Sequence, residues 1–493
     1  IGEEGVVVAR RAERERARAD GVRLIRFEYC DVSGVARTKS IHVDQLEHKL
    51  LEGVSLTRAQ MAINLLEQLV PIEGMEPVGE IRLVPDPATL TVLPWSPGSA
   101  SVLCDQLDHD RQDWGACPRS FLKRQLERAA ALGLTVQATF ENEYYLATER
   151  DGRYFPHDVP GHAPVYSSIG HDHAADVMLE TVDALTSQGM RVEQAINEYG
   201  PGQKEISIRH TDALGAADNQ MKFRDTVRGV AYRHGLFASF AAKPFPDEIG
   251  SGAHVHFSLW DTDGRRSLLY DPALPGALSL LGRRFIAGVC EHLPSLTALT
   301  VPSYNSYRRL RPSAWASATT AWGFDNKEVA LRIASPFYKR EEQSYNIEFK
   351  ASDGSANPYL SLGALIACGL DGIERELELG SIEATTKVAQ SLFRMATEGK
   401  NVAAAIFWMK ARAGWREKQP EGQPSEEHRC IPEMTDVERE SLARRGNRHA
   451  HLLEHLSSEQ VSAMLEKLRR SIATEAARAG SQPRLIDGHA DEA

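Results

Sequence analysis

The chain has 493 residues, which is too long for one compact core and predicts two or more domains. Hydrophobic residues make up 42% of the chain and charged residues 25%, which is the ordinary usage of globular proteins. Because the formal net charge is −11, the composition argues against a general nucleic-acid-binding protein, whose affinity depends on basic patches.

Three further features concern the environment of the protein. The longest apolar stretch, at about residues 359–370, is too short to cross a bilayer. Residues 10–16 have mixed charge, which predicts an amphipathic helix without the apolar core of a signal peptide. The six cysteines lack the spacing of a metal knuckle or a disulfide framework. Together these features predict a cytoplasmic protein with no membrane partner.

The first part of the chain predicts a small N-terminal domain that mixes helices and strands. Residues 22–30 and 36–43 have the pattern of two strands around a turn at 31–34. Short segments rich in proline and glycine follow, which is typical of further strands and turns. We therefore assign residues 1–112 to this domain.

The second domain is predicted to span residues 113–493. It opens with a helix over about 119–132, which begins directly after a Cys-Pro pair. Strands and helices then alternate to about residue 375, and the rest of the chain has a mostly helical pattern. A divergent helical insertion, which reads as a peripheral helical pair, is predicted at about 381–432.

Four strand-like segments of the second domain carry polar residues on one face. Because side chains alternate along a strand, residues two apart point to the same side of a sheet. The residues between them are mostly apolar, as expected for a sheet packed against a core. The four polar faces hold Glu141 and Glu143; Glu205, Ser207 and Arg209; His254, His256 and Ser258; and Glu348 and Lys350.

Five glutamates would repel one another strongly if these faces met, and such a cluster persists only when cations neutralise it. Carboxylates with a single imidazole favour Mg²⁺ or Mn²⁺ over zinc, and such ions commonly share the phosphate oxygens of a nucleotide. A set of half-exposed strands with solvated polar faces also explains any one segment. The four together favour a metal site, because their faces carry acids and histidines. The five carboxylates are those of Glu141, Glu143, Glu198, Glu205 and Glu348.

Five motifs in order resemble those of the glutamine synthetase family, over about residues 22–375. A single glycine-histidine motif would be weak support, whereas five motifs in register rarely arise by chance. The motifs are Glu141-Asn-Glu143, Glu198-Tyr-Gly-Pro-Gly-Gln-Lys-Glu205, Gly250-Ser-Gly-Ala-His-Val-His256, Asn305-Ser-Tyr-Arg-Arg-Leu310 and Asn357-Pro-Tyr-Leu360.

The resemblance implies two or three bound Mg²⁺ or Mn²⁺ ions and ATP as a co-substrate. Ligands of the first metal match Glu143, Glu198 and Glu205, and those of the second match Glu141, His254 and Glu348. His256 and Ser258 match ATP-contacting positions, and Gly250, Arg309 and Lys350 match glutamate-binding positions. Arg332, Lys327 and Arg309 match catalytic positions, the first two on the phosphate side.

Each position also has a plainer explanation when it is read alone. Arg309 and Arg332 are also explained as surface ion-pair partners, His256 as a structural histidine and Gly250 as a turn glycine. At the level of the fold, the resemblance implies a small β-grasp domain followed by a catalytic domain with a funnel-like antiparallel sheet. It also implies a homo-oligomeric ring, a dodecamer by family resemblance, with active sites between subunits.

The sequence departs from the type I pattern where ammonium is handled. Trp315 stands at the position of a flap glutamate that helps to deprotonate ammonium, and residues 53–58 lack an ammonium-binding aspartate. Lys327 and Lys350 replace arginines, which keeps the charge and loses the bidentate fork. Trp315 is therefore predicted to contact the acceptor, and the divergent C-terminal region puts the ring assembly in question.

Three functions are compatible with the sequence. The favoured one is an ATP-dependent ligase that forms γ-glutamyl phosphate from glutamate and transfers the glutamyl group to an amine. Within it, ammonia, the substrate of glutamine synthetase itself, competes with an organic amine. The second is a non-catalytic regulatory homologue that binds nucleotide or glutamate, although the retained metal-ligand positions oppose it. The third is a phosphotransferase with a different acceptor.

Overall fold

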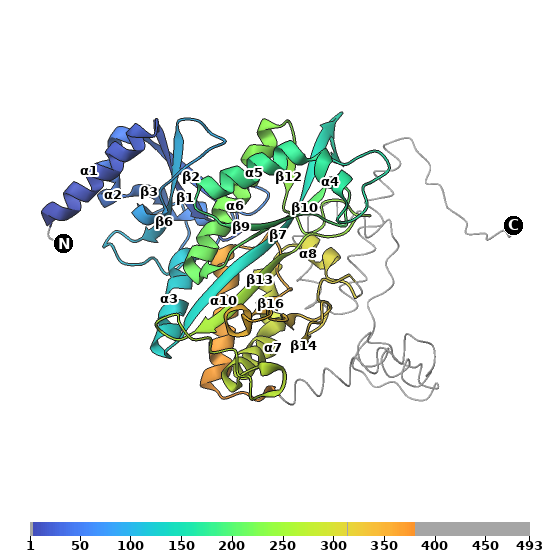
Figure 1. Cartoon of the computed structure of the whole chain (residues 1–493). Helices are drawn as coiled ribbons and strands as arrows, with labels where there is room; N and C mark the ends of the chain where they lie inside the picture. The colour runs from blue at the N-terminus through green and yellow to red at the C-terminus, as the bar shows by residue number, and fades with distance from the viewer. Residues whose placement is uncertain (1–2, 313, 380–493) are drawn as a thin grey trace, which may run out of the picture. The chain divides into compact units, whose positions relative to one another are not determined.

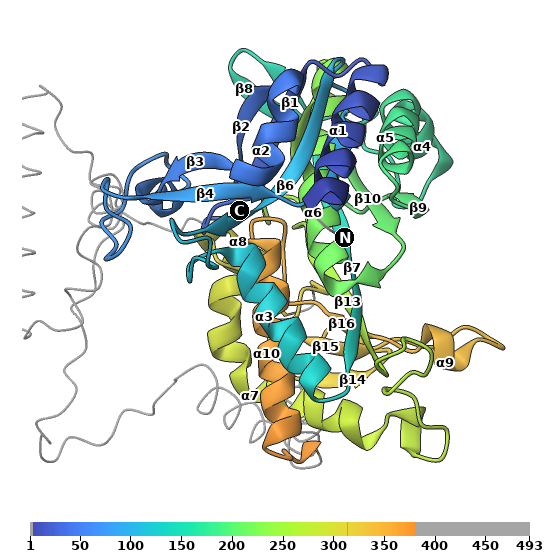
Figure 2. The ribbon, with the colours of Figure 1, turned by 90° about the vertical axis from the view of Figure 1, so that its left-hand side faces the viewer.

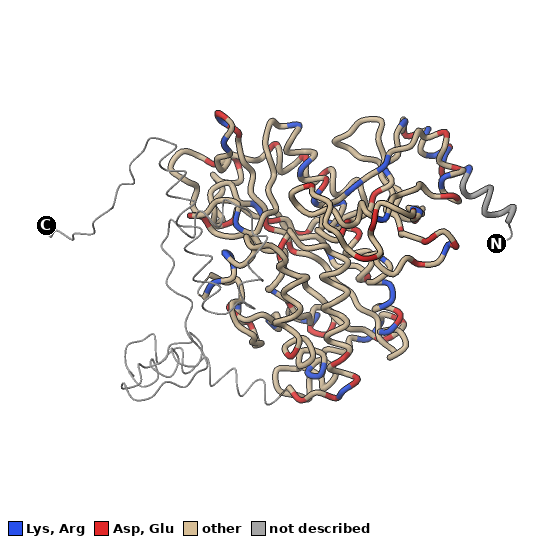
Figure 3. The backbone as a smooth tube through the Cα atoms, turned by 180° about the vertical axis from the view of Figure 1, so that it is seen from behind, with Lys and Arg blue, Asp and Glu red and all other residues tan. Residues whose placement is uncertain are grey.

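The computed structural model describes residues 3–312 and 314–379 (Figure 1). The predicted insertion at 381–432 and the helical C-terminal region lie outside these residues. No helix of the described part is long and apolar enough to cross a membrane. Basic and acidic positions are interspersed along the chain in Figure 3, so net charge alone does not single out a site.

The N-terminal domain is a six-stranded sheet with two helices. The strand order is β2-β1-β6-β4-β3, β5 also pairs with β6, and β1 runs parallel to β6. The strands expected at 22–30 and 36–43 are confirmed as β1 and β2. The elements are α1 (Glu3–Ala19), β1 (Leu24–Cys30), β2 (Ala36–His42), α2 (Leu46–Glu52), β3 (Val54–Thr57), β4 (Glu80–Pro85), β5 (Thr91–Val92) and β6 (Ser99–Leu107).

A ten-stranded sheet forms the body of the second domain, and β7 lies at its centre. Its main path has the order β14-β15-β16-β13-β7-β10-β9, and β8, β11 and β12 also pair with β7. Only the β14–β15 pair is parallel among its described pairings. The strands are β7 (Thr135–Arg150), β8 (Arg153–Pro156), β9 (Val192–Asn197), β10 (Gln203–Ile208), β11 (Thr211–Asp212), β12 (Phe237–Ser239), β13 (Ala253–Trp260), β14 (Trp322–Phe324), β15 (Leu331–Ile333) and β16 (Ile347–Phe349).

Helices cover one face of this sheet, and Figure 2 shows α3, α10 and α7 lying along it. The helix predicted at 119–132 is confirmed as α3, with Cys117 as its N-cap and a proline at its first position. The fold class predicted from the sequence is confirmed. The helices are α3 (Pro118–Ala131), α4 (Ser168–His173), α5 (Ala175–Ser187), α6 (Ala213–Arg233), α7 (Leu280–Thr300), α8 (Tyr304–Arg309), α9 (Glu341–Ser344) and α10 (Pro358–Glu374).

The alternation of residues along β13 separates the core from the cavity. Val255 and Phe257 are buried among apolar residues of α7 and α10, and the ring centroids of Phe257 and Phe285 lie 5.3 Å apart. Helices α7 and α10 can approach closely because residue 288 is a glycine. A Cβ at this position would lie 2.2 Å from the carbonyl oxygen of Cys368. The helices therefore fix one face of the sheet and leave the polar face of β13 to the cavity.

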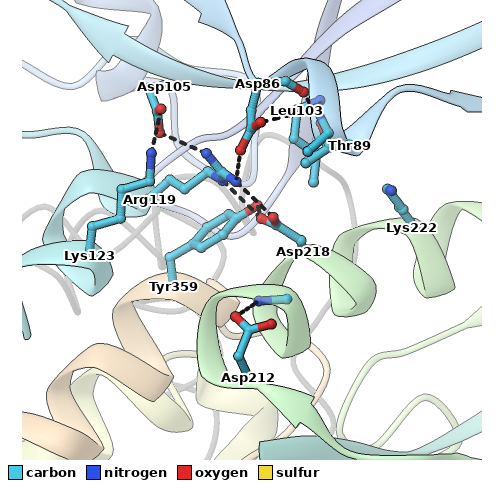
Figure 4. Close-up of polar contacts among 12 residues, drawn as sticks. Asp86, Thr89, Leu103, Asp105, Arg119, Lys123, Asp212, Asp218, Lys222 and Tyr359 are labelled. Atoms are coloured by element: carbon cyan, nitrogen blue, oxygen red, sulfur yellow. Dashed lines mark hydrogen bonds and ion pairs between the residues drawn. The ribbon is translucent and has the colours of Figure 1, made fainter. Parts of the chain in front are cut away.

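A buried ionic junction at Arg119 connects the two domains (Figure 4). This arginine of α3 is 3% exposed, and its Nε and Nη2 donate to both carboxylate oxygens of Asp218 on α6 at 2.9 and 2.8 Å. Its guanidinium also donates to Asp105 of β6 at 3.0 Å and to Asp86 at 2.8 Å. The Tyr359 hydroxyl of α10 donates to Asp218 at 2.8 Å. One guanidinium thus binds carboxylates from both domains.

Removing this guanidinium should destabilise the protein far more than removing a surface arginine of the same helix. We expect Arg119→Ala to lower the free energy of unfolding by about 3–5 kcal/mol, because it leaves buried carboxylates without their partner. Arg128→Ala, which breaks an exposed pair with Glu374, should cost about 1 kcal/mol or less. Urea denaturation of both variants measures the difference, and equal losses would contradict the role of the junction.

Candidate active site

The register of β7 brings acidic residues and a histidine together on the polar face of the sheet. Glu141 lies opposite His254 of β13, and Glu143 lies opposite Glu205 of β10. Since Glu141 and Glu143 are two residues apart, both point to the face that the helices do not cover. The sequence prediction that these faces meet therefore agrees with the observed pairing.

A second set of residues reaches the same face through β16. Glu348 lies opposite both His256 of β13 and Arg332 of β15. The Arg332 guanidinium donates to the Glu348 carboxylate at 2.7 Å, and the Lys350 ammonium donates to it at 3.1 Å. Glu348 is only 1% exposed, so its charge is balanced by cations rather than by water.

Both histidines of β13 contact the acids. Nδ1 of His254 lies 3.2 Å from Glu348 and 3.5 Å from Glu141, and Nε2 of His256 lies 3.4 Å from Glu141. Ligand atoms of Glu141, His256 and Glu348 all lie within 4.8 Å of one another, which suits a metal ion. This group contains His256, whereas the sequence predicted His254 as the imidazole ligand; both histidines contact Glu141.

The other half of the cluster is more acidic. Glu143 accepts hydrogen bonds from the backbone N–H of Gly252 at 2.9 Å and from the Gln203 amide at 3.2 Å. Glu205 and Glu198 line the same cavity, and neither forms an ion pair with a lysine or arginine of the described chain. This half therefore has more carboxyl groups than cationic partners.

The pKa values of the carboxyl groups reflect this difference. Burial and the charges of Glu141 and Glu143 raise the pKa of Glu205 to about 10, and burial together with Glu143 raises the pKa of Glu198 to about 7. At Glu348 burial opposes ionisation, but the hydrogen bond from His254 and nearby cations hold its pKa well below the ordinary value. The chemistry of this donor set, several carboxylates with an imidazole, fits hard divalent ions such as Mg²⁺.

A cavity of about 1130 Å³ opens over the cluster. The two ATP-contacting candidates, His256 and Ser258, line it, and the Ser258 hydroxyl accepts a hydrogen bond from the Trp260 indole at 2.8 Å. The volume exceeds that of a typical single-ligand pocket, so it has room for a nucleotide beside an amino acid.

Arg309 lies under the loop that carries Gly250. The arginine is 4% exposed, and it donates to the carbonyls of Ser352 at 2.9 Å and Lys350 at 3.2 Å. Its Nε has no partner among the described residues. A Cβ on Gly250 would lie 2.5 Å from the Arg309 side chain, so glycine is needed for this close approach. Gly250, Arg309 and Lys350 thus line one part of the cavity.

An aromatic row, formed by Trp315, Tyr199 and Tyr166, lines another part. Tyr199 meets both neighbours edge to face, at centroid distances of 5.6 Å to Trp315 and 6.1 Å to Tyr166. The Lys327 ammonium lies 5.1 Å from the centroid of the Trp315 ring. The backbone N–H of Trp315 donates to the Glu328 carboxylate at 3.1 Å. Lys327 was expected on the phosphate side, and it contacts Trp315, the residue predicted to contact the acceptor amine.

Sequence patterns alone did not single out Tyr199 and Tyr166. Tyr199 lies inside the motif that begins at Glu198, so the sequence shows that it follows a candidate metal ligand. The sequence does not show which way its side chain points. Tyr166 lies in a loop outside any motif, and only the folded chain brings it to the cavity.

Comparison with known proteins agrees with this geometry. A family model of the glutamine synthetase catalytic domain matches residues 115–404, and one of the glutamine synthetase N-terminal domain matches residues 8–118. The chain belongs to the glutamine synthetase family. Members of this family generally use ATP and divalent metal ions.

Its relatives include enzymes named for different acceptors. The chain is 35% identical over 380 residues to type-1 glutamine synthetase 1 of Dictyostelium discoideum, covering 72% of this chain and 75% of that one. It is 32% identical to a glutamate–isopropylamine ligase of a Pseudomonas species, covering 78% and 85%. It is 36% identical to the gamma-glutamylpolyamine synthetase GlnA3 of Streptomyces coelicolor, covering 72% and 76%.

Two solved structures share the fold. A crystal structure described as a novel glutamine synthase homolog superposes with a TM-score of 0.68 at 33% identity, covering 73% of this chain and 84% of that one. Ligand-free GmaS superposes with a TM-score of 0.67 at 28% identity, covering 81% and 90%. The family is thus shown at the level of the C–N ligase, while the acceptor remains to be assigned.

The acidic half of the cluster should cost stability in the absence of metal. Since its pKa is raised to about 10, Glu205 destabilises the metal-free fold as the pH rises above about 4.3, the ordinary pKa of glutamate. We expect Glu205→Gln to raise the melting temperature in EDTA at neutral pH and to reduce the stabilisation by Mg²⁺.

A matched control is Glu193→Gln, because Glu193 lines the cavity on exposed β9 outside the cluster. Thermal unfolding with EDTA and with Mg²⁺ compares the two variants. A Glu205→Gln protein that melts lower in EDTA than the wild type and still gains full stabilisation from Mg²⁺ would remove Glu205 from the metal site.

Proposed function

We propose that the protein is an ATP-dependent γ-glutamyl ligase that joins the side-chain carboxylate of glutamate to a primary organic amine. The observation that carries this proposal is the aromatic row in the same cavity as the carboxylate cluster. The carboxylate cluster fits the binding of metal ions for phosphoryl transfer. The aromatic row offers an apolar surface at the place where an acid would be needed to deprotonate ammonium.

In this proposal, the two halves of the cluster hold separate divalent ions. Bound ions would neutralise the phosphate oxygens of the nucleotide and of the transferring group. The first ion is assigned to Glu143, Glu198 and Glu205, none of which pairs with a lysine or arginine of the described chain. The second is assigned to Glu141, His254 and Glu348, beside the ATP-contacting candidates His256 and Ser258.

The basic side chains hold the reacting groups. Arg332, whose Nε has no partner among the described residues, faces the cavity beside Glu348 and is assigned to the γ-phosphoryl group. Arg309 and Lys350 are assigned to the α-carboxylate of glutamate. The γ-phosphoryl group passes from ATP to the glutamate side chain, which gives γ-glutamyl phosphate and ADP. The neutral amine then attacks the acyl carbon, phosphate leaves, and the nitrogen loses a proton.

Ammonia is the second candidate acceptor, and one observation favours it. The Glu328 carboxylate lies 3.1 Å from the backbone nitrogen of Trp315, so an acid does reach the loop in which the flap glutamate is missing. It does not line the cavity, however, whereas the indole of Trp315 does. The homo-oligomeric ring and the cytoplasmic location stay predictions.

The acceptor can be identified by competition between amines and ammonia. An alkyl group that packs on the exposed aromatic row gains about 0.8 kcal/mol per buried methylene, so we expect kcat/KM for a primary alkylamine to exceed that for ammonia by about ten-fold. Phosphate release from ATP and glutamate measures both rates. Trp315→Glu should shift the preference toward ammonia, while Trp315→Phe should keep it. A wild-type preference for ammonia would return the protein to glutamine synthesis.

The role of Arg309 can be separated from a merely structural one by kinetics. A charged hydrogen bond to a partly buried carboxylate is worth about 1.5–3 kcal/mol, so Arg309→Ala should raise KM for glutamate by about ten-fold or more. Arg309→Lys keeps the charge, so its KM for glutamate should lie between those of the wild type and Arg309→Ala. KM for ATP serves as the internal control. An unchanged KM for glutamate in a folded Arg309→Ala protein would contradict the assignment.

A further inference from the structure

The acceptor side of the cavity carries a positive charge of its own. Lys327 rests on the indole of Trp315, at 5.1 Å from the ring centroid, so the chain itself occupies the face where an external cation would bind. Its neighbour Glu328 holds the backbone of Trp315 from the same loop. The two residues together fix the orientation of the indole.

The aromatic row is exposed and held in place. Trp315, Tyr199 and Tyr166 are 47%, 41% and 55% exposed, an unusual degree for three adjoining aromatic side chains. Trp315 and Tyr166 have φ values of 51° and 57°, in the left-handed region that bulky residues rarely adopt. Such backbone strain persists where the surrounding structure fixes it, which occurs often at ligand sites.

The row adjoins the carboxylate cluster. Tyr199 follows Glu198 in the chain, and its backbone N–H donates to the Glu198 carboxylate at 3.2 Å. An amine whose nitrogen reaches the cluster would therefore lay its substituent along the three rings. The row thus has the length and chemistry to bind an alkyl or aryl group.

Outside the carboxylate cluster, basic residues outnumber acids in the lining of the cavity. Of the described residues that line the cavity, Glu193 is the single acid outside the cluster. Basic side chains are numerous there, and burial together with the charge of nearby Arg311 lowers the pKa of Lys243. The basic residues of the lining outside the candidate glutamate and phosphate positions are Arg209, Lys243, Arg308, Arg311, Lys327 and Arg340.

We infer that the acceptor is a monoamine with an apolar substituent, and that Lys327 acts as a specificity-determining residue that excludes diamines and polyamines. This inference rests on the proposed ligase function and narrows its substrate class. An ammonium at the far end of a diamine would meet the Lys327 ammonium over Trp315, while the nearby Glu328 carboxylate holds the Trp315 backbone and does not line the cavity. An alkyl end would instead pack on Trp315 and Tyr199.

A pair of isosteric substrates tests the inference. n-Pentylamine and putrescine have the same chain of heavy atoms, and differ by a terminal methyl in place of a terminal ammonium. We expect kcat/KM of the full-length protein for n-pentylamine to exceed that for putrescine by about ten-fold or more, from like-charge repulsion at the far end. Phosphate release with ATP, Mg²⁺ and glutamate measures both, with ammonia as a third arm.

Two lysine variants isolate the charge. Lys327→Met should raise the putrescine to n-pentylamine ratio of kcat/KM several-fold, and this ratio cancels any effect common to both substrates. Lys339→Met is the control, because Lys339 also lies over an aromatic ring, at 5.2 Å from the Tyr338 centroid, but does not line the cavity. It should leave the ratio unchanged.

The outcomes separate the two proposals. If both amines exceed ammonia and putrescine equals or exceeds n-pentylamine, the monoamine inference is wrong and the ligase proposal stands. If Lys327→Met leaves the putrescine to n-pentylamine ratio of kcat/KM unchanged, Lys327 does not determine the amine specificity. If ammonia is preferred to both amines, or if no acceptor promotes phosphate release, the proposed function fails and the inference fails with it.

Discussion

The pairing register of β7 is the constraint on which the candidate site depends. With β10 on one side and β13 on the other, this strand puts Glu141 opposite a histidine and Glu143 opposite a glutamate. A slip of one residue would turn both acids toward the helices and bring Asn142 and an aromatic neighbour to the cavity side in their place. The apolar packing of Val255 and Phe257 against α7 and α10 makes such a slip costly, so the core also fixes the chemistry.

Much of this arrangement was predictable because its signals are local. Alternation along a strand is enough to show that Glu141 and Glu143 share a face, and the motif around Gly250 indicates a loop beside them. The strands of the N-terminal domain and helix α3 also follow from turn residues, caps and apolar patterns. Family resemblance then supplied the fold class and the funnel-like sheet, which alternation alone does not contain.

The acceptor side was less predictable because it depends on contacts between distant loops. The sequence showed a tryptophan in place of an acid at Trp315, but gave no partner for it. The placement of Tyr166, and of Lys327 over the indole, results from tertiary packing of loops that have no periodic pattern. Strained backbone at Trp315 and Tyr166 likewise leaves no trace in residue type, since neither is glycine.

The ionic junction at Arg119 has a consequence for how the chain can be divided. A cut near residue 112 separates the six-stranded sheet from the ten-stranded sheet, but it leaves Asp86 and Asp105 on one fragment and their guanidinium on the other. The larger fragment would keep only the Asp218 partner, and the smaller would expose the face of β6 that this contact covers. The boundary drawn along the sequence therefore cuts through a buried ionic contact. We expect the two domains to unfold together, and a swap of the N-terminal part between relatives to require both sides of this contact.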